Sequence, residues 1–429
     1  MPFATNRVIL TFLASSGRRA FRCLTPRKPG LQPVILSFAA ALALGSLLSA
    51  PPSARAQPLL YTGTNLSGGE FSDVHLGQTP IYGKDYIYPN AGEMAYFASK
   101  GVNVIRLPFH WETIQPAAKA PLIPAEVQRL KGVVAAARQQ NIVVLLDPHG
   151  GARYYGKVIG GPDVSDADFA DFWGRMAAEF RNDPHVWFGL MNEPHEMPTL
   201  QWLDAANAAV GAIRKTGAKN LILVPGNAWS GAHSWVNSGN NALLKIVDPA
   251  NHYAFEAHQY LDADSSGTHP DTVSATAGSE RLQVFTTWCR TNHKRAFLGE
   301  FGVGAGDTNG AAIRDMLTMM EKNRDVWIGY TWWSAGPWWG NYMYTLEPDK
   351  GVDRPQMSWL LPHLHGAPKG VGSRAPTKSR ATTKSRAPTK SRATTKSRAT
   401  TKSRAMIKSR AMIKSRAMIK SRAMIKFGH

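Results

Sequence analysis

The stretch VWFGLMNEPH, residues 186–195, is an uncharged apolar run that ends in polar and acidic residues. A run that is continuously apolar, rather than alternating, is typical of a strand buried on both faces of a parallel sheet. The chain contains eight such runs, spaced about 30 to 45 residues apart, which is room for one strand and one crossover helix each. They cover residues 59–66, 102–109, 142–148, 186–192, 221–225, 253–260, 296–301 and 328–334.

Stretches with helical periodicity lie between these runs, among them residues 91–100, 125–140 and 166–181. In the second of them, apolar residues recur three or four apart, as on one face of a helix. Eight strand–helix units predict an α/β chain folded as a (β/α)8 TIM barrel. The alternative is an open doubly wound sheet, which normally carries a glycine-rich turn for a phosphate group. Residues 65–69, NLSGG, match that turn too loosely, so we expect no cofactor.

The formal net charge of the 429-residue chain is +20, but the excess lies at its two ends. Residues 1–57 hold seven basic and no acidic residues, and residues 373–429 hold 18 basic and no acidic residues. Residues 58–372 therefore carry a net charge of −5. Specific nucleic-acid binding by this body is not expected, because phosphate contacts need basic residues on the folded surface. A content of 43% hydrophobic residues excludes a wholly disordered chain.

Residues 1–56 are predicted to be a signal peptide that directs secretion. A basic region over 18–28 is followed by the uncharged apolar run 34–50 and by the small residues of Ala-Arg-Ala at 54–56. The alternative is a membrane anchor, since 17 apolar residues are at the lower limit for crossing a bilayer. We expect removal of the leader and no stable anchor afterwards.

Residues 367–429 are predicted to form a disordered tail after a catalytic domain at 57–366. From Lys378 the tail repeats the hexapeptide KSRATT, or a close variant, and then KSRAMI four times. A period of six gathers apolar residues on no face of a helix or strand, and the uncompensated Lys and Arg repel one another. Repeat expansion without function and adhesion to an anionic surface remain alternatives for its role.

The two cysteines, Cys23 and Cys289, are too few for a disulfide-stapled fold. Cys289 lies in an apolar-periodic stretch with Val284, Phe285 and Trp288. We therefore expect Cys289 to be a core residue rather than a reactive thiol.

Two carboxylates, Glu193 and Glu300, directly follow the fourth and seventh predicted strands. The carboxyl ends of the strands form the active face of a (β/α)8 barrel, so the two side chains can meet despite their separation in sequence. Two facing carboxyl groups suit cleavage of a glycosidic bond, in which one donates a proton and the other attacks the anomeric carbon. The alternative is that both cap helices or pair with Arg at loop mouths.

Residues 190–195, LMNEPH, and 298–302, LGEFG, resemble the acid/base and nucleophile signatures of glycoside hydrolase family 5, specifically of its endoglucanases. The resemblance extends over nearly all of residues 57–366. It implies that Glu193 is the acid/base and Glu300 the nucleophile. It also implies a retaining mechanism, with carboxyl groups about 5–5.5 Å apart.

Further residues fall where that family has the rest of its active site: Arg106, His149, His258, Tyr260 and Trp333. Arg106 and the Tyr260 hydroxyl are candidates to keep Glu300 ionised, and Asn192 is a candidate to bind the sugar 2-hydroxyl. We expect the two histidines to support the carboxylates or sugar hydroxyls, with core packing as the alternative.

Five of the 13 tryptophans follow strand ends and are predicted to stack on sugar rings: Trp111, Trp229, Trp333, Trp338 and Trp339. Residues 332–340 are interpreted as the floor and rim of the cleft, with Trp333 as the platform for the sugar being cleaved. Several aromatic platforms in a row suit a polymer better than a monosaccharide.

The sequence as a whole predicts a secreted, monomeric endo-β-1,4-glucanase acting on cellulose-like β-glucan. An endo-β-mannanase, another β-glucanase and a non-catalytic polysaccharide-binding barrel remain alternatives. No catalytic metal is expected, because no pair of histidines has the helical spacing of a zinc site and no cysteine lies near the predicted site.

Overall fold

A closed barrel of eight parallel strands forms the centre of the computed structural model, which describes residues 57–366. Around the barrel the strands follow the order β1-β10-β9-β8-β7-β6-β3-β2. Their bounds are β1 (Tyr61–Leu66), β2 (Val104–Phe109), β3 (Val143–Pro148), β6 (Val186–Gly189), β7 (Ile222–Pro225), β8 (Tyr253–His258), β9 (Ala296–Glu300) and β10 (Trp327–Ala335). β1 pairs with β2 on one side and with β10 on the other, which closes the sheet. The predicted TIM barrel is confirmed, and the open doubly wound sheet is wrong.

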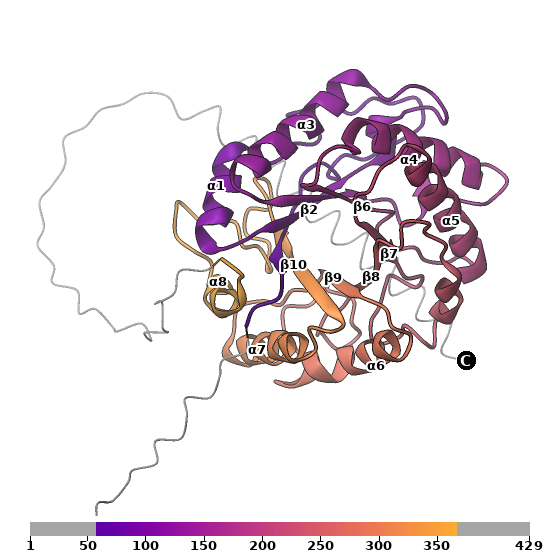
Figure 1. The fold of residues 1–429 in the computed structure, drawn as a ribbon. Coiled ribbons are helices and arrows are strands. Elements are labelled where there is room, and N and C mark those ends of the chain that lie inside the picture. The colour runs from indigo at the N-terminus through magenta and orange to yellow at the C-terminus, as the bar shows by residue number, and fades with distance from the viewer. Residues whose placement is uncertain (1–56, 367–429) are drawn as a thin grey trace, which may run out of the picture. The chain divides into compact units, whose positions relative to one another are not determined.

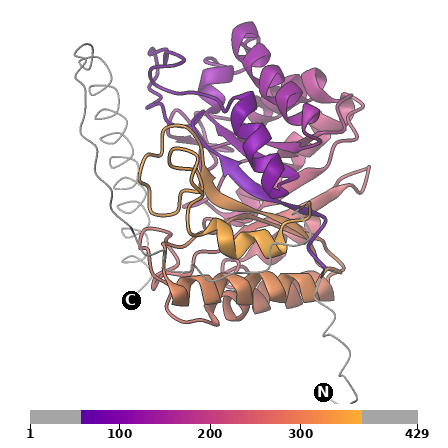
Figure 2. The same ribbon diagram turned by 90° about the vertical axis from the view of Figure 1, so that its left-hand side faces the viewer.

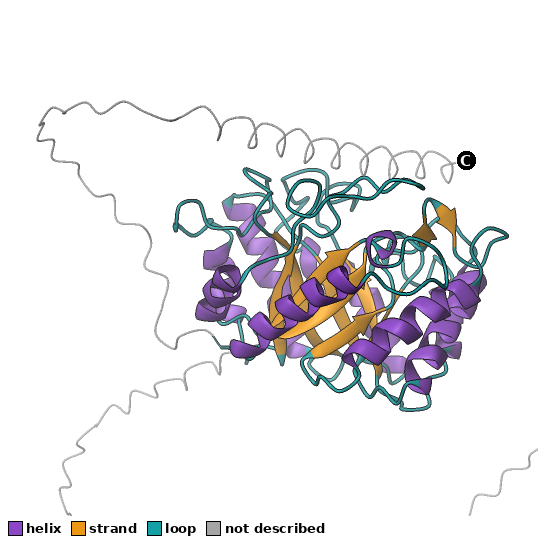
Figure 3. Cartoon of the chain, turned by 90° about the horizontal axis from the view of Figure 1, so that it is seen from above, coloured by secondary structure: helices purple, strands orange, loops and turns teal. Residues whose placement is uncertain are grey.

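Long helices surround the barrel, as Figures 1 and 3 show. They are α1 (Ala91–Lys100), α3 (Pro124–Gln139), α4 (Asp166–Phe180), α5 (Thr199–Lys215), α6 (Ala277–Thr291) and α7 (Asp307–Lys322). The remaining elements are short: α2 (Trp111–Ile114), β4 (Arg153–Tyr154), β5 (Lys157–Val158), η1 (Asn240–Lys245), α8 (Met357–Leu360) and η2 (Leu361–His363). α8 packs beside α7 on the outside of the barrel (Figure 2).

Side chains on the inner face of the strands form two layers of different chemistry. The layer nearer the starts of the strands is an apolar cluster that includes Val104, Leu145, Trp187, Leu223, Ala254, Phe297 and Ile328. Residues two apart on a strand share a face, so Arg106, Asp147 and Glu256 lie directly beyond Val104, Leu145 and Ala254. The inside of the barrel is therefore apolar toward the strand starts and charged toward their carboxyl ends.

Cys289 is fully buried in α6, and burial raises the pKa of its thiol. The prediction that it is a core residue is confirmed.

Several predictions concern residues outside the described range 57–366. These are the signal peptide at 1–56, which contains Cys23, and the disordered repeat tail at 367–429. Within residues 57–366, no helix is long and apolar enough to cross a membrane.

Candidate active site

Two buried glutamates lie close together at the carboxyl ends of two strands. Glu193 follows β6 and Glu300 is the last residue of β9. One carboxylate oxygen of each, together with a ring nitrogen of His258, lies within 4.8 Å of the others. Glu193 has a φ of 42°, a left-handed conformation that non-glycine residues adopt only where the surrounding structure imposes it. The fold, rather than local preference, therefore directs Glu193 toward Glu300.

Glu300 accepts hydrogen bonds from two side chains, Tyr260 just after β8 and Arg106 on β2. The Tyr260 hydroxyl donates to its Oε2 at 2.7 Å, and Nη1 of Arg106 donates to its Oε1 at 3.1 Å. Both oxygens of Glu300 are thus fixed in position by hydrogen bonds of the kind a carboxylate accepts.

Arg106 is a fully buried cation at the centre of the charged layer. Its burial would lower the pKa, but the attraction of Asp147, Glu256 and Glu300 outweighs burial and raises it. Its guanidinium nitrogens lie within 3.1 Å of an oxygen of five side chains: Asn65, Asp147, Asn192, Glu256 and Glu300. Arg106 therefore holds together side chains from β1, β3, β8, β9 and the loop after β6.

His258 connects two carboxylates through its two ring nitrogens. Nδ1 lies 3.0 Å from Oε1 of Glu193, and Nε2 lies 3.2 Å from Oε1 of Glu256. Burial would lower the pKa of His258, but the carboxylates of Glu300, Glu193 and Glu256 outweigh it and raise the pKa to about 9. The imidazole is thus stabilised in its charged form.

His149 and Trp333 form a stacked pair beside the carboxylates. Their ring centroids are 5.4 Å apart with planes 16° from parallel, and Nδ1 of His149 lies 2.8 Å from Oδ2 of Asp147. Trp333 is 97% buried and meets Trp339 edge-on at 5.9 Å. Asp147 and the indole thereby fix the orientation of the His149 ring.

Trp229 stacks on His195, with ring centroids 4.8 Å apart and planes 8° from parallel. Its backbone N–H donates to the carbonyl of Pro194 at 3.0 Å, and Nδ1 of His195 lies 2.7 Å from the Glu193 carbonyl oxygen. The half-buried Trp229 is therefore fixed to the loop that carries Glu193.

The prediction that Trp111 stacks on a sugar is wrong. Trp111 is 1% exposed, and its indole lies 4.2 Å from the ring of Tyr154 and 5.1 Å from that of Phe172. The chain enters α2 at Trp111, which turns the side chain toward α4 rather than into the barrel mouth. Trp339 is also buried, between Phe71 and Tyr342, whereas Trp338 is half-buried.

Two buried acids of the site were not singled out from the sequence, namely Asp147 and Glu256. Each contacts Arg106, and each lies beside a histidine of its own segment. Burial raises the pKa of Asp147, although the attraction of Arg106 opposes it. Their signal is an acid two residues before a histidine at the end of an apolar run, as in Asp147-Pro148-His149 and Glu256-Ala257-His258.

A second group of metal-binding residue types lies on the loop after β8. Oxygens and a nitrogen of Asp262, Asp264 and His269 lie within 4.8 Å of one another. The carboxylate of Asp262 accepts backbone N–H groups of Gly267 and Thr268, each at 3.1 Å, so loop folding accounts for the cluster. We assign a metal neither here nor at Glu193 and Glu300, and a site without metal or cofactor stays a prediction.

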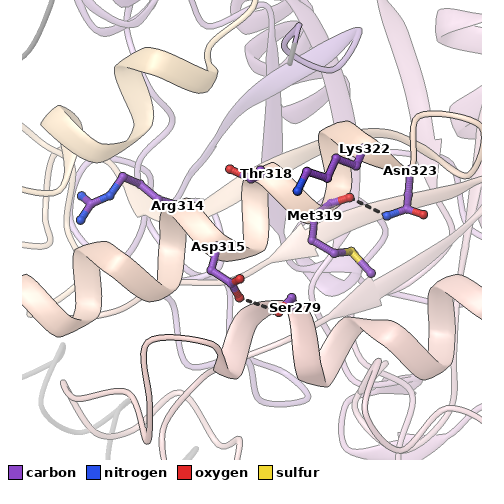
Figure 4. Close-up of a pocket in the computed structure, with 7 residues that line it drawn as sticks. All are labelled: Ser279, Arg314, Asp315, Thr318, Met319, Lys322 and Asn323. Atoms are coloured by element: carbon purple, nitrogen blue, oxygen red, sulfur yellow. Dashed lines mark hydrogen bonds between the residues drawn. The ribbon is translucent and has the colours of Figure 1, made fainter. Parts of the chain in front are cut away.

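A surface groove lies between α6 and α7, on the outside of the barrel (Figure 4). It is lined by Ser279, Arg314, Asp315, Thr318, Met319, Lys322 and Asn323. None of these residues belongs to a strand end, so the groove is separate from the carboxylate site.

Comparison with known families decides the class of this site. Residues 56–336 match the family described as "Cellulase (glycosyl hydrolase family 5)", which is more than half of the chain. The chain belongs to glycosyl hydrolase family 5. The resemblance of residues 190–195 and 298–302 to signatures of this family is thereby confirmed, and the protein is a glycoside hydrolase with a cellulase domain.

Relatives of this family 5 chain include both fungal and bacterial proteins. It is 39% identical over 317 residues to a probable endo-beta-1,4-glucanase B of Neosartorya fischeri, covering 73% of this chain and 93% of the relative. The chain is 38% identical over 311 residues to endo-beta-1,4-glucanase A of Emericella nidulans. The match covers 72% of this chain and 93% of that relative. The crystal structure of endo-beta-1,4-glucanase Xac0029 from Xanthomonas axonopodis pv. citri is 49% identical, with a TM-score of 0.69, covering 72% of this chain and 99% of that one.

Proposed function

We propose that this family 5 protein is a secreted endo-β-1,4-glucanase that cleaves internal bonds of cellulose-like chains with retention of anomeric configuration. The observation that carries the proposal is that one carboxylate oxygen of Glu193 and one of Glu300 lie within 4.8 Å of each other. Retaining enzymes hold their two carboxyl groups about 5–5.5 Å apart, whereas inverting enzymes leave about 6.5–9.5 Å for a water molecule. The short separation supports direct attack by a carboxylate.

In the first step, Glu193 donates a proton to the glycosidic oxygen while Glu300 attacks the anomeric carbon. The leaving chain departs, and an ester joins the remaining sugar to Glu300. In the second step, Glu193 takes a proton from water, whose oxygen bonds to the anomeric carbon as the ester breaks. Hydrogen bonds from Tyr260 and Arg106 aim Glu300 for the attack.

Asn192 has an orientation suited to the sugar 2-hydroxyl. Its Oδ1 accepts from Nη2 of Arg106 at 2.8 Å, so the group it offers a substrate is the N–H donor of its amide. A hydrogen bond to the 2-hydroxyl strengthens as positive charge develops on the sugar ring.

The substrate class rests on the relatives together with the aromatic residues. The curated relatives are described as endo-beta-1,4-glucanases, and a structure 48% identical to this chain, with a TM-score of 0.70, is described as a complex with cellopentaose. Indole rings at Trp229 and Trp333 suit the apolar faces of glucose units. Secretion as a monomer is proposed from the sequence of residues 1–56 and the single-barrel site.

A substrate panel tests the proposal. Purified protein is assayed for release of reducing ends from carboxymethylcellulose, mannan, xylan and lichenan at equal mass concentration. We expect carboxymethylcellulose to be cleaved with a rapid fall in viscosity, which marks internal cleavage. Preferential release from mannan would contradict the glucanase assignment, and an inverted first product by NMR would contradict the retaining mechanism.

Chemical rescue by azide distinguishes the roles of the two glutamates. Glu193→Ala and Glu300→Ala should each lower kcat by a factor of about 10³ or more on unactivated substrate, because each removes a group that acts in the transition state. With an aryl cellobioside and azide, Glu193→Ala should yield the β-glycosyl azide and Glu300→Ala the α-glycosyl azide. The opposite pair of products would exchange the two roles, and wild-type rates in either variant would remove that residue from the mechanism.

A further inference from the structure

Glu256 is a buried carboxylate for which the two-step reaction has no direct use. It lies on β8 two residues before His258, so both side chains face the barrel interior. Its Oε1 is 2.9 Å from Nε of Arg106 and 3.2 Å from Nε2 of His258. Glu256 thus links the central cation of the site to the histidine that contacts Glu193.

The space for this contact is created by Gly299, the residue before Glu300. A Cβ at position 299 would lie 2.1 Å from Oε1 of Glu256 and 2.8 Å from Nε2 of His258. Real side chains do not approach so closely, so only glycine fits beside this pair. The β9 strand is therefore shaped to let Glu256 and His258 meet next to Glu300.

The charge of Glu256 determines where His258 carries its first proton. Burial would raise the pKa of Glu256, but Arg106 and His258 outweigh it and hold the pKa below its usual value. An ionised carboxylate only accepts hydrogen bonds, so Nε2 of His258 must carry a proton. The other ring nitrogen, Nδ1, lies 3.0 Å from Oε1 of Glu193 and is left to share one further proton with it.

We propose that Glu256 is a positioning residue, an inference that rests on the proposed function. Glu256 fixes a proton on Nε2 of His258, so that Nδ1 of His258 and Glu193 share the one proton used in catalysis. This proton leaves the Glu193–His258 pair for the glycosidic oxygen in the first step. In the second step, water returns a proton to the pair while its oxygen bonds to the anomeric carbon and the Glu300 ester breaks. Each cycle therefore begins and ends with the same number of protons.

Among residues 57–366, the charged groups around His258 come from four other segments as well as from β8. Glu193 and Glu300 lie 3.0 and 3.7 Å from Nδ1, and Glu256 lies 3.2 Å from Nε2. Asp147 on β3 and Arg106 on β2 complete the set. Asp147 is the matched control, because it contacts Arg106 at 3.0 Å and His149 at 2.8 Å but acts on His258 only from a distance.

The pH dependence of kcat/KM tests the proposal in the full-length protein. Glu256→Gln removes the negative charge that supports the imidazolium, so the Glu193–His258 pair should lose its proton at lower pH. We expect the alkaline limb of the profile to move down by about one to two pH units. Glu256→Asp keeps the charge and should leave the alkaline limb near its parental position even if kcat falls. Asp147→Asn should move the alkaline limb less than Glu256→Gln does. An unmoved limb in Glu256→Gln, or an equal shift in Asp147→Asn, would overturn the proposal.

A measurement that needs no turnover separates this inference from the proposed function. In protein labelled with ¹⁵N-histidine, the His258 ring signals are assigned by their loss in His258→Gln. We expect protons on both ring nitrogens of the parent at pH 7, and loss of one of them at lower pH in Glu256→Gln than in the parent. A neutral ring protonated only at Nδ1 would refute the role of Glu256. A protein without glucanase activity would refute the proposed function and leave these spectra interpretable.

Discussion

Trp229 is the middle of three successive residues whose backbone adopts a left-handed conformation. Ala228, Trp229 and Ser230 each have a φ of 56°, a conformation that costs a non-glycine residue about 1–2 kcal/mol. The turn is held by the Ser230 hydroxyl, which donates to the Gly226 carbonyl at 3.1 Å, and by the Trp229 N–H bond to Pro194. Backbone strain of this kind persists only where the surrounding structure imposes it, and it is common at positions that orient a functional side chain.

Trp229→Ala should therefore weaken substrate use without weakening the fold. We expect kcat/KM for cellopentaose to fall about tenfold, because a stacking contact of about 1.4 kcal/mol is lost, while the thermal midpoint stays close to that of the parent. Trp111→Ala is the comparison, since the buried Trp111 should instead cost about 3–5 kcal/mol of stability. A Trp229 variant with parental kcat/KM would show that no sugar stacks there.

The residues of the site differ in how far sequence can predict them. The convergence of Glu193 and Glu300 could be predicted because one lies after a buried strand and the other at the end of one, where side chains meet. Asp147 and Glu256 were harder to predict as site residues, because an acid at the end of a strand can equally begin a solvent-exposed loop. Only the structure shows that both contact Arg106. Trp111 was misassigned because its position after a strand does not reveal that α2 begins there.

At the scale of elements, helix α1 has stabilising residues at both of its ends. The Asn90 side chain accepts from the N–H groups of Gly92 at 2.8 Å and Glu93 at 3.3 Å, and Glu93 accepts from the Asn90 N–H at 2.8 Å. This reciprocal arrangement satisfies donors that have no partner inside the helix. At the other end, Gly101 adopts a φ of 98°, which glycine tolerates without a Cβ clash.

Asn90→Ala should lower the free energy of unfolding by about 1 kcal/mol, because the Oδ1 that accepts from Gly92 and Glu93 and the Nδ2 that donates to Glu93 are both lost. Urea unfolding followed by circular dichroism measures the change. Asn90→Ser retains an acceptor oxygen and should restore most of the stability. Equal losses in both variants would indicate that the cap contributes nothing through its side-chain oxygen.

The helices and strands were largely predictable because burial and periodicity act over whole segments. All eight apolar runs became barrel strands, and the starts of α1 and α4 fell where the pattern placed them. Strand ends were less predictable: β6 stops at Gly189, yet Leu190, Met191 and Asn192 remain buried beyond it. Apolar composition reports burial, whereas the end of a strand depends on pairing with its neighbours, which sequence does not show.

At the scale of the whole molecule, burying acids makes stability depend on pH. Burial raises the pKa of Glu70 from 4.5 to about 7 against hydrogen bonds from the backbone, and burial likewise raises the pKa of Glu93 to about 7. The folded protein therefore keeps protons that the unfolded chain releases between pH 4.5 and 7. The free energy of unfolding should fall as pH rises through this window, because the unfolded state binds fewer protons there.

Glu70→Gln tests this dependence, because the amide imitates the protonated acid and can still accept the N–H of Gly68, which the carboxylate accepts at 2.8 Å. At about 1.4 kcal/mol for each pH unit, a shift from 4.5 to about 7 corresponds to about 3 kcal/mol. In urea unfolding we expect Glu70→Gln to equal the parent at pH 4.5 and to exceed it by up to about 3 kcal/mol at pH 8. Asp73→Asn, which changes an exposed carboxyl on the same loop, is the control, and as a surface substitution it should change the free energy of unfolding by no more than about 0.5 kcal/mol. A Glu70 variant that loses as much stability with rising pH as the parent would show that Glu70 does not carry a retained proton.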